Sequence, residues 1–232
     1  MPVGVLTLCS CVLLGSILGC LFGRYVPQTT RDYLNTLLGF SGMALGINSI
    51  VKATAMSPVI LAVVVGSALG ELCGLERRVT ALASKALKAL PLRPGPDFDM
   101  ERYITAVVLF CFSGLGFYGT LLEAMSGDPS ILLSKSVLDF CTALVFAITL
   151  GAATALITAP MLCILLLTFA LGSWVAPLTT PAMLQDFMAC GGVLTLAAGL
   201  RISGIKRTPV TNMIPSLILT LPLSWLWSLL PL

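Results

Sequence analysis

Apolar segments long enough to cross a lipid bilayer follow one another along most of this chain of 232 residues. A membrane-spanning helix needs about 20 apolar residues in a row. Only 10% of the residues are charged, whereas a soluble globular domain has about 25%. The sequence therefore predicts an all-α polytopic membrane protein in which residues 1–232 form one transmembrane domain. Eight spans can be counted, near 3–23, 34–54, 57–75, 104–122, 137–159, 161–177, 183–204 and 212–230.

The least distinct boundary lies between the fifth and sixth spans, where only ITAPM (Ile157–Met161) interrupts the apolar run. Residues 137–177 are about twice too long for a single crossing, so we expect Pro160 to begin a tight turn. The first apolar run has no basic residue before it. This predicts a retained first span rather than a cleaved signal peptide.

Lysine and arginine are distributed unevenly between the loops that eight spans create. Cytoplasmic loops carry the excess of these residues, which predicts both termini outside and the loop 76–102 in the cytoplasm. Of the 13 basic residues, Lys52 and Lys135 fall on one face, and the other 11 (13 − 2) fall on the opposite face: Arg24, Arg31, Arg77, Arg78, Lys85, Lys88, Arg93, Arg102, Arg201, Lys206 and Arg207.

The loop 76–102 begins with ERRVTALASKALKALP (Glu76–Pro91). Apolar residues recur there at helical spacing, with most of the basic residues on the other side. The pattern is typical of a basic amphipathic helix on the inner leaflet. A solvated connector helix fits it equally well.

The residue types also exclude several kinds of chemistry. The chain has no histidine, which removes the usual general base and the commonest metal ligand. Its eight cysteines lie in or beside apolar runs without a CxxC pair, as small buried side chains do. We therefore expect no metal site, no cofactor and no enzymatic activity. Membrane topology explains the basic residues, so the expected partner is the lipid bilayer and not a nucleic acid.

A short motif recurs at an offset of 150 residues: VPQTT (Val26–Thr30) and APLTT (Ala176–Thr180). Each copy lies between two spans and begins a helix, with Thr30 and Thr180 as expected N-caps and Pro181 in the first turn. Five crossings separate the copies, so they would have opposite orientations. This predicts an inverted-topology repeat with copies near 1–75 and 150–230 (spans 1–3 and 6–8), an architecture of many secondary transporters. A helix start common to both copies explains part of the match without a repeat.

Glycines form two stripes with a spacing of four residues, which lets helix backbones approach closely. The packing could occur within one chain or between copies, so a homodimer is compatible with it. The segment SGLGFYG (Ser113–Gly119) in the fourth span predicts either a locally unwound helix or a close helix contact. The two stripes consist of Gly15, Gly19, Gly23, Gly66, Gly70 and Gly74.

Charges gather in EAMSGDPSILLSKSVLD (Glu123–Asp139), although long apolar runs flank it. Asp128 before Pro129 predicts a helix start, and the helix is expected to run from Pro129 to about Ala159. On its wheel, Asp128, Lys135, Asp139 and Thr142 share one stripe. Lys135 and Asp139 are one turn apart and can pair.

Two interpretations of this stripe stay open. The charges could extend to water from an interfacial helix, or the stripe could face into the bundle and line a cavity. A charge in lipid costs at least about 2.5–3.5 kcal/mol, which a site facing protein or water avoids. The candidate residues of a solute or ion path are Glu123, Asp128, Ser130, Lys135, Asp139 and Asn48.

Three other polar residues have simpler explanations. Asn48 could equally make a helix–helix hydrogen bond. Glu71 is expected to form an interfacial ion pair with Arg77 and Arg78. Asp186 falls in the first turn of the seventh span, where an acid suits the helix dipole.

Three segments resemble the YdfK/YqgA-type family of uncharacterised bacterial inner-membrane proteins: GDPSILLSKSVLDF (Gly127–Phe140), LRISGIKRTPVTNMIPSL (Leu200–Leu217) and GELCGLE (Gly70–Glu76). The resemblance extends over essentially the whole chain. It implies a multi-pass protein of the bacterial cytoplasmic membrane. It brings no activity and no catalytic residues.

The leading hypothesis is a secondary transporter or ion-conducting protein for a small solute or ion. In this hypothesis Asp139 binds a cation or proton, and Lys135 is its alternating partner. The alternative is a non-transporting membrane scaffold or regulatory protein. It would assemble through the glycine stripes and meet anionic lipid or a cytoplasmic protein through residues 76–102.

Overall fold

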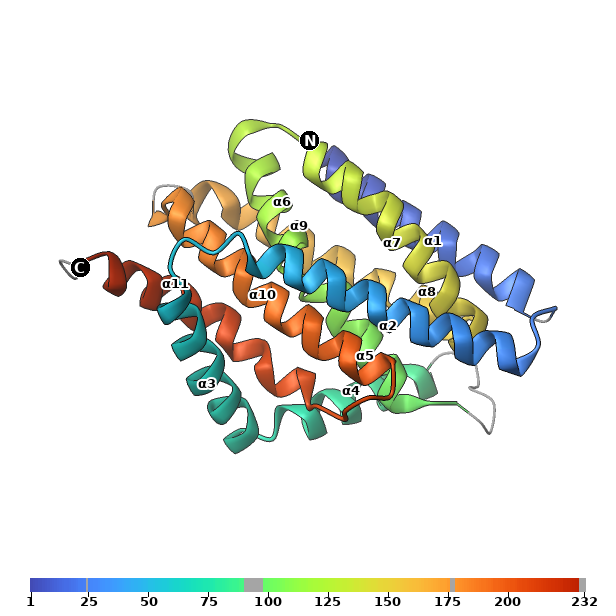
Figure 1. Ribbon diagram of the computed structural model, residues 1–232. Coiled ribbons are helices and arrows are strands. Elements are labelled where there is room, and N and C mark those ends of the chain that lie inside the picture. Colours follow the sequence, from blue (N-terminus) through green and yellow to red (C-terminus); the bar gives the residue numbers. More distant parts are fainter. Residues whose placement is uncertain (24, 90–97, 176–177, 230–232) are drawn as a thin grey trace.

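The computed structural model describes residues 1–23, 25–89, 98–175 and 178–229. Within these ranges the chain is built from helices without a strand (Figure 1). The helical elements are α1 (Val3–Gly23), α2 (Gln28–Ile50), α3 (Met56–Leu72), α4 (Leu75–Ala89), α5 (Met100–Cys111), α6 (Gly114–Ser126), α7 (Ser130–Leu150), α8 (Ala153–Leu156), α9 (Thr158–Val175), α10 (Pro181–Ile202), η2 (Val210–Met213) and α11 (Ile214–Ser228).

Three pairs of long helices pack along most of their length (Figure 1). Helices α1 and α7 run parallel, because Gly4 meets Leu132 at one end and Gly23 meets Ile148 at the other. Helices α2 and α10 run antiparallel, and so do α3 and α11. The helix α4 and the segment η2 contact each other at one end of the bundle. We call it the α4 end, and the opposite end, where α2 stops before Lys52, the Lys52 end.

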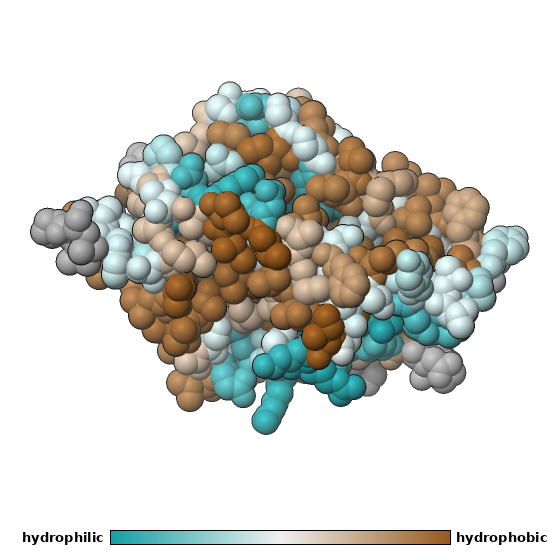
Figure 2. Space-filling view, viewed as in Figure 1, coloured by the Kyte–Doolittle hydropathy of each residue, from teal (hydrophilic) through white to brown (hydrophobic). Residues whose placement is uncertain are grey.

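Length and composition identify six candidate membrane spans among the described residues, or seven if the bent pair α3–α4 counts as one. The fold is thus that of a helical membrane protein. Figure 2 shows hydrophobic residues covering much of the visible face, with hydrophilic residues along its lower edge and in a group near its upper centre. The six spans are Val3–Gly23, Met100–Ser126, Ser130–Leu150, Ala153–Gly172, Pro181–Ile202 and Val210–Ser228.

The turn between the fifth and sixth apolar segments differs from the expected one. The helix from Pro129 was expected to reach Ala159, but α7 ends at Leu150 and the chain turns at Gly151, which has φ 63° and ψ −148°. Glycine adopts this backbone conformation without a steric penalty. Pro160 does not begin the turn; it lies in the first turn of α9, where a missing N–H leaves no intrahelical bond unmade.

Of the two helix caps expected in VPQTT (Val26–Thr30) and APLTT (Ala176–Thr180), only the second is confirmed. Thr180 is the N-cap of α10: its hydroxyl oxygen accepts a hydrogen bond from the Met183 N–H, and Pro181 is the first helical residue. Thr30 is not a cap, because α2 already begins at Gln28, after Pro27. Residues 176–177 of the second motif lie outside the described residues.

The amphipathic helix of the loop 76–102 forms as α4, and its apolar side meets protein. Leu87 is 2% exposed, and Val79 and Ala83 pack against the same apolar cluster. Leu82, at the edge of the apolar side, is 72% exposed. The helix therefore closes the α4 end of the bundle and is not simply a solvated connector. The rest of the loop, 90–97, lies outside the described residues.

Five of the six stripe glycines pack against another helix of the same chain. Gly15, Gly19 and Gly23 lie against the α7 backbone, and Gly66 and Gly70 lie against Ser216 and Asn212 of α11 and η2. Gly74 differs, since a Cβ added to it would have no atom of another described segment within 4 Å; it has φ 60° and lies at the 62° bend between α3 and α4.

Two glycines of α2 predict contrasting effects on stability. In Gly46→Ala, the added carbon would lie 2.7 Å from the Gly192 carbonyl oxygen, whereas in Gly42→Ala the nearest atom is Gly199 Cα at 3.6 Å. Overpacking costs about 1–3 kcal/mol, so Gly46→Ala should lower the free energy of unfolding by that amount. Gly42→Ala should cause no loss. Denaturant unfolding of the detergent-solubilised protein measures both, and equal stability would contradict the backbone contact.

Candidate functional site

A cavity of about 90 Å³ lies among α2, the junction between α5 and α6, α7 and α10. We call it the central cavity. One water needs about 10–15 Å³ of such volume, so several waters or a small solute fit. Exposed residues of α2 and α7, including Leu45 and Leu138, lie along its mouth. Its polar lining residues are Ser41, Asn48, Ser49, Lys52, Ser113, Lys135, Asp139, Thr142 and Thr195.

The charged centre of the central cavity is an ion pair on α7. Lys135 Nζ donates to Asp139 Oδ1 and Oδ2, both at 2.7 Å. The residues are only 6% and 7% exposed, so the pair lies inside the bundle and does not extend to bulk water. A Cβ on Gly116 would lie 3.3 Å from Lys135 Cε, so the glycine leaves room for the lysine. Burying an ion pair is costly unless polar groups or water surround it.

The predicted irregularity in the fourth span lies at this cavity. Helix α5 ends at Cys111, and α6 begins at Gly114 after a break at Phe112 and Ser113. Gly114–Gly119 of the predicted segment are helical, so the break lies at its start and the segment itself is not unwound. Gly114 packs against Gly191 of α10, as the close-contact alternative predicted. The end of α5 leaves backbone carbonyls without helical partners, and the start of α6 leaves N–H groups. Leu109, Ser113 and Gly114 bring these ends to the cavity wall.

A second, more open pocket of about 480 Å³ lies beside the cavity, toward the Lys52 end. We call it the vestibule. Lys52 and Leu115 line both spaces. Ser130 and Ser134 of α7 line the vestibule, one turn apart. The vestibule therefore lies next to the cavity that holds the Lys135–Asp139 pair, and polar side chains line both spaces.

The six predicted path residues separate into three groups. Asn48, Lys135 and Asp139 line the central cavity, and Ser130 lines the vestibule. Asp128 and Glu123 line neither space.

Asp128 and Glu123 stabilise helix starts. Asp128 accepts hydrogen bonds from the hydroxyl and backbone N–H of Ser130, and these bonds lower the pKa of its carboxyl below the ordinary value. Glu123 is 4% exposed and accepts from the N–H groups of Gly4 at 2.6 Å and Val5 at 3.3 Å. It thereby caps α1, whose first N–H groups have no helical partner.

Asp186 stabilises a helix other than its own. Its carboxylate is 1% exposed and accepts from the N–H groups of Thr54 and Ala55 at 2.9 Å and from the Ser224 hydroxyl at 2.6 Å. It therefore holds the start of α3 against α10 and α11. The expected place of Asp186 in the first turn of its own helix is wrong, because α10 begins at Pro181 and has no acid in its first turn. The helix start that Asp186 stabilises is more than 100 residues away in the sequence.

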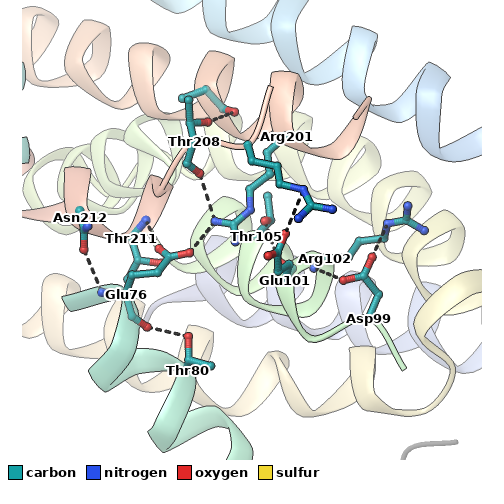
Figure 3. Close-up of polar contacts among 12 residues, drawn as sticks. Glu76, Thr80, Asp99, Glu101, Arg102, Thr105, Arg201, Thr208, Thr211 and Asn212 are labelled. Atoms are coloured by element: carbon teal, nitrogen blue, oxygen red, sulfur yellow. Dashed lines mark hydrogen bonds and ion pairs between the residues drawn. The ribbon is translucent and has the colours of Figure 1, made fainter. Parts of the chain in front are cut away.

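A polar network at the α4 end was not predicted (Figure 3). Arg201 Nη1 donates to Glu76 Oε1 at 2.7 Å and to the Thr208 carbonyl at 3.2 Å. Glu76 also accepts from the Thr211 N–H, and Asn212 Oδ1 accepts from the Glu76 N–H. The network links α4, α10 and η2. Only the single arginine inside an apolar span could have signalled it.

The Asn212 amide also donates to Glu71. The expected pairing of Glu71 with Arg77 and Arg78 is absent from the ion pairs of the described residues. The described residues also contain no group of three or more histidine, cysteine or acidic side chains that could hold a metal ion.

Comparisons with known proteins identify relatives without an assigned activity. Residues 3–225 match the family described as "Protein of unknown function (DUF554)". The chain is 41% identical to the uncharacterized protein YqgA of Escherichia coli (strain K12) over 231 residues, which cover 98% of each chain. It is 31% identical to the uncharacterized membrane protein YdfK of Bacillus subtilis (strain 168), over 90% of this chain and 89% of the relative. No solved structure matches.

The burial of the Lys135–Asp139 pair predicts strong coupling between the two side chains. Lys135→Met leaves the Asp139 carboxylate buried without its partner, which should cost about 3–5 kcal/mol of unfolding free energy. Lys135→Met/Asp139→Asn removes both charges and should recover much of that loss. Unfolding of the single and double variants in detergent measures the coupling.

The exposed pair of Arg207 and Glu101, 3.9 Å apart, provides the control. Glu101→Gln should change stability by less than about 1 kcal/mol. A Lys135→Met effect as small as this would mean that the α7 pair is solvated.

Proposed function

The chain belongs to the DUF554 family, which has no known activity, and we propose from its site that it is a secondary transporter or ion-conducting protein for a small solute or ion, and not an enzyme. One observation carries the proposal: the buried Lys135–Asp139 pair borders the central cavity, and the open vestibule beside it shares the lining residues Lys52 and Leu115. Ionisable residues within a membrane span are rare, and they mark ion pathways and proton relays.

The ion pair suits a site that must bind and release a cation. Asp139 hydrogen-bonds to Lys135, so a cation or proton that binds Asp139 displaces the ammonium. Removing one partner of a buried pair costs about 3–5 kcal/mol. The entering cation offsets this cost, and Lys135 restores the pair when the cation leaves. The lysine is thereby the alternating partner of Asp139.

The break between α5 and α6 adds binding groups to the same site. Discontinuous helices in transporters direct carbonyl oxygens toward cations and helix N-termini toward anionic groups. Ser113 and Gly114 at the break line the cavity with Asp139. An irregular backbone at membrane depth is tolerated where it lines a cavity or is buried in protein. The break meets the first of these conditions, because Ser113 and Gly114 line the central cavity. This position supports a functional role for the break.

Eight spans and an inverted repeat are part of the proposal. Helix α2 has 23 residues, or about 34 Å at 1.5 Å per residue, which matches a hydrocarbon core of about 30 Å. Gly46 meets Leu196, and Gly66 meets Ser216. The two residues of each pair are 150 positions apart (196 − 46 and 216 − 66), which is the offset between VPQTT and APLTT. Equivalent residues of two repeats meet only on their symmetry axis, so these contacts support a two-fold axis between α2–α3 and α10–α11.

We further propose that the α4 end faces the cytoplasm of a bacterial cell and that both termini lie outside, in the inner membrane. The described part of the chain has Arg31, Arg201 and the basic residues of α4 at the α4 end, with Lys52 at the other end. Cytoplasmic loops carry such an excess of basic residues, so the distribution supports a cytoplasmic α4 end. Arg24 and Arg93 lie outside the described residues.

The scaffold alternative has less support. Gly15, Gly19, Gly23, Gly66 and Gly70 already pack inside the chain, so they do not need a second copy. The apolar side of α4 is likewise covered by protein.

Loss of the Asp139 charge should abolish flux. In proteoliposomes we expect Asp139→Asn to reduce ion or proton flux at least about tenfold, because an asparagine cannot form the alternating ion pair. Asp32→Asn, an exposed change on α2, should leave flux unchanged. Equal flux for wild type and Asp139→Asn across a broad panel of cations would remove Asp139 from the mechanism.

The proposed eight spans make a separate prediction about α2. Tyr33→Cys and Lys52→Cys, near the two ends of α2, should react with an impermeant thiol reagent from opposite sides of the membrane. Site-specific labelling in spheroplasts and inverted vesicles, read by mass spectrometry, measures the sidedness. Labelling of both positions from the same side would mean that α2 does not cross.

A further inference from the structure

We propose that the solute path continues to the α4 end through a third pocket and the buried Asn35 amide, behind an apolar barrier of Leu38, Leu109 and Ile202. This inference rests on the proposed transport function, and it adds the half of the path that faces the cytoplasm. The species that it takes is a small hydrated polar solute or cation, the same one that reaches Asp139.

This third pocket has a volume of about 180 Å³ and lies among α5, α10 and the segment after α10. We call it the α4-end pocket. Thr105, Arg201, Ile202 and Arg207 are among its lining residues. Figure 3 labels Thr105 and Arg201. Three arginines line it, while Glu76 pairs with Arg201, Asp99 with Arg102 and Glu101 with Arg207. The charges therefore balance, which suits water and a small polar solute better than a strongly charged anion.

Only a short apolar barrier separates this pocket from the central cavity. On α5, Thr105 lines the pocket and Leu109 lines the cavity, a separation of about 6 Å at 1.5 Å per residue. On α10, Ile202 and Thr195 line the two spaces, about 10 Å apart along the helix. Leu38, Leu109 and Ile202 belong to one apolar cluster. A small repacking of these side chains would join the two spaces.

A polar side chain without a partner lies at the level of this barrier. Asn35 is 2% exposed, and neither its amide nitrogen nor its amide oxygen has a hydrogen-bond partner among the described residues. Such buried unsatisfied groups are rare in native proteins and call for an explanation. Gly39 meets Gly199 and Ser203, so Asn35, one turn earlier in the same antiparallel register, lies toward the end of α10. The amide is thus available to water or solute when the barrier opens.

The proposed repeat gives the direction of that opening. The positions 41, 42 and 45 line the central cavity, and so do their counterparts 191, 192 and 195, at the offset of 150. Asn48, Ser49 and Lys52 continue the lining toward the Lys52 end. Their counterparts, at 198, 199 and 202, do not line the cavity, and Ile202 faces the α4-end pocket instead. Exchanging the conformations of the two repeats would close the side of Lys52 and open the side of Ile202.

Thiol labelling tests the path without measuring flux. The full chain carrying Asn35→Cys is reconstituted in proteoliposomes, a cationic methanethiosulfonate is added from the α4 side, and mass spectrometry reads modification at position 35 separately from the eight native cysteines. The control is Leu37→Cys, which is 40% exposed on the same helix and faces lipid. Thiolates form in water and not in lipid, so we expect the cysteine at position 35 to react at least about tenfold faster than the cysteine at position 37. Equal or slower reaction at position 35 would overturn the proposal.

A second variant tests the barrier. Asn35→Cys/Leu38→Ala should make position 35 reactive from the Lys52 side as well, whereas Asn35→Cys/Leu37→Ala should not. No labelling from that side in the Leu38→Ala background would contradict the apolar barrier. These readouts separate the two proposals: unchanged flux in Asp139→Asn contradicts transport through Asp139, and an unreactive position 35 in a protein that transports contradicts only the continuation of the path.

Discussion

Close contact between helix backbones is the constraint on which this fold depends. Lipid tails are as apolar as leucine, so helices in a membrane associate through packing and hydrogen bonds rather than through the hydrophobic effect. Glycines provide that packing in all three long pairs, α1–α7, α2–α10 and α3–α11. In α2–α10 the contact is reciprocal, since Gly46 meets the Gly192 carbonyl and Gly192 meets the Gly46 carbonyl. The α2–α10 contact also fixes the wall of the central cavity.

Carboxylates have two kinds of role in this bundle. Glu123 and Asp186 accept hydrogen bonds from the free N–H groups at the starts of α1 and α3, and Glu76 binds Arg201 and Thr211 at the α4 end. These three acids join elements distant in sequence. Asp139 has a different environment, because it pairs with a lysine of its own helix and borders a cavity. This contrast distinguishes Asp139 as the candidate for ion binding.

Sequence reasoning succeeded where a signal was local and failed where it was not. The Thr180 cap and the start of α7 after Asp128 follow from short-range hydrogen bonding that the residue types dictate. The end of α7 was misplaced because Pro160 is the more conspicuous residue, although Gly151 adopts the backbone conformation that ends the helix. The partners of Asp186 and Arg201 are more than 100 residues away, and no periodicity in one sequence contains that information.

The sequence by itself determined that the chain is a helical membrane protein, where most of its helices lie, and that Lys135 and Asp139 share one helix face. These features follow from apolar length, helical periodicity and local capping, which act over a few residues. Only the tertiary structure decided that this face turns inward, that the broken fourth span lies beside it, and that Asn35 is buried without a partner. The reason is that a cavity wall consists of several helices, so its existence depends on packing between distant segments.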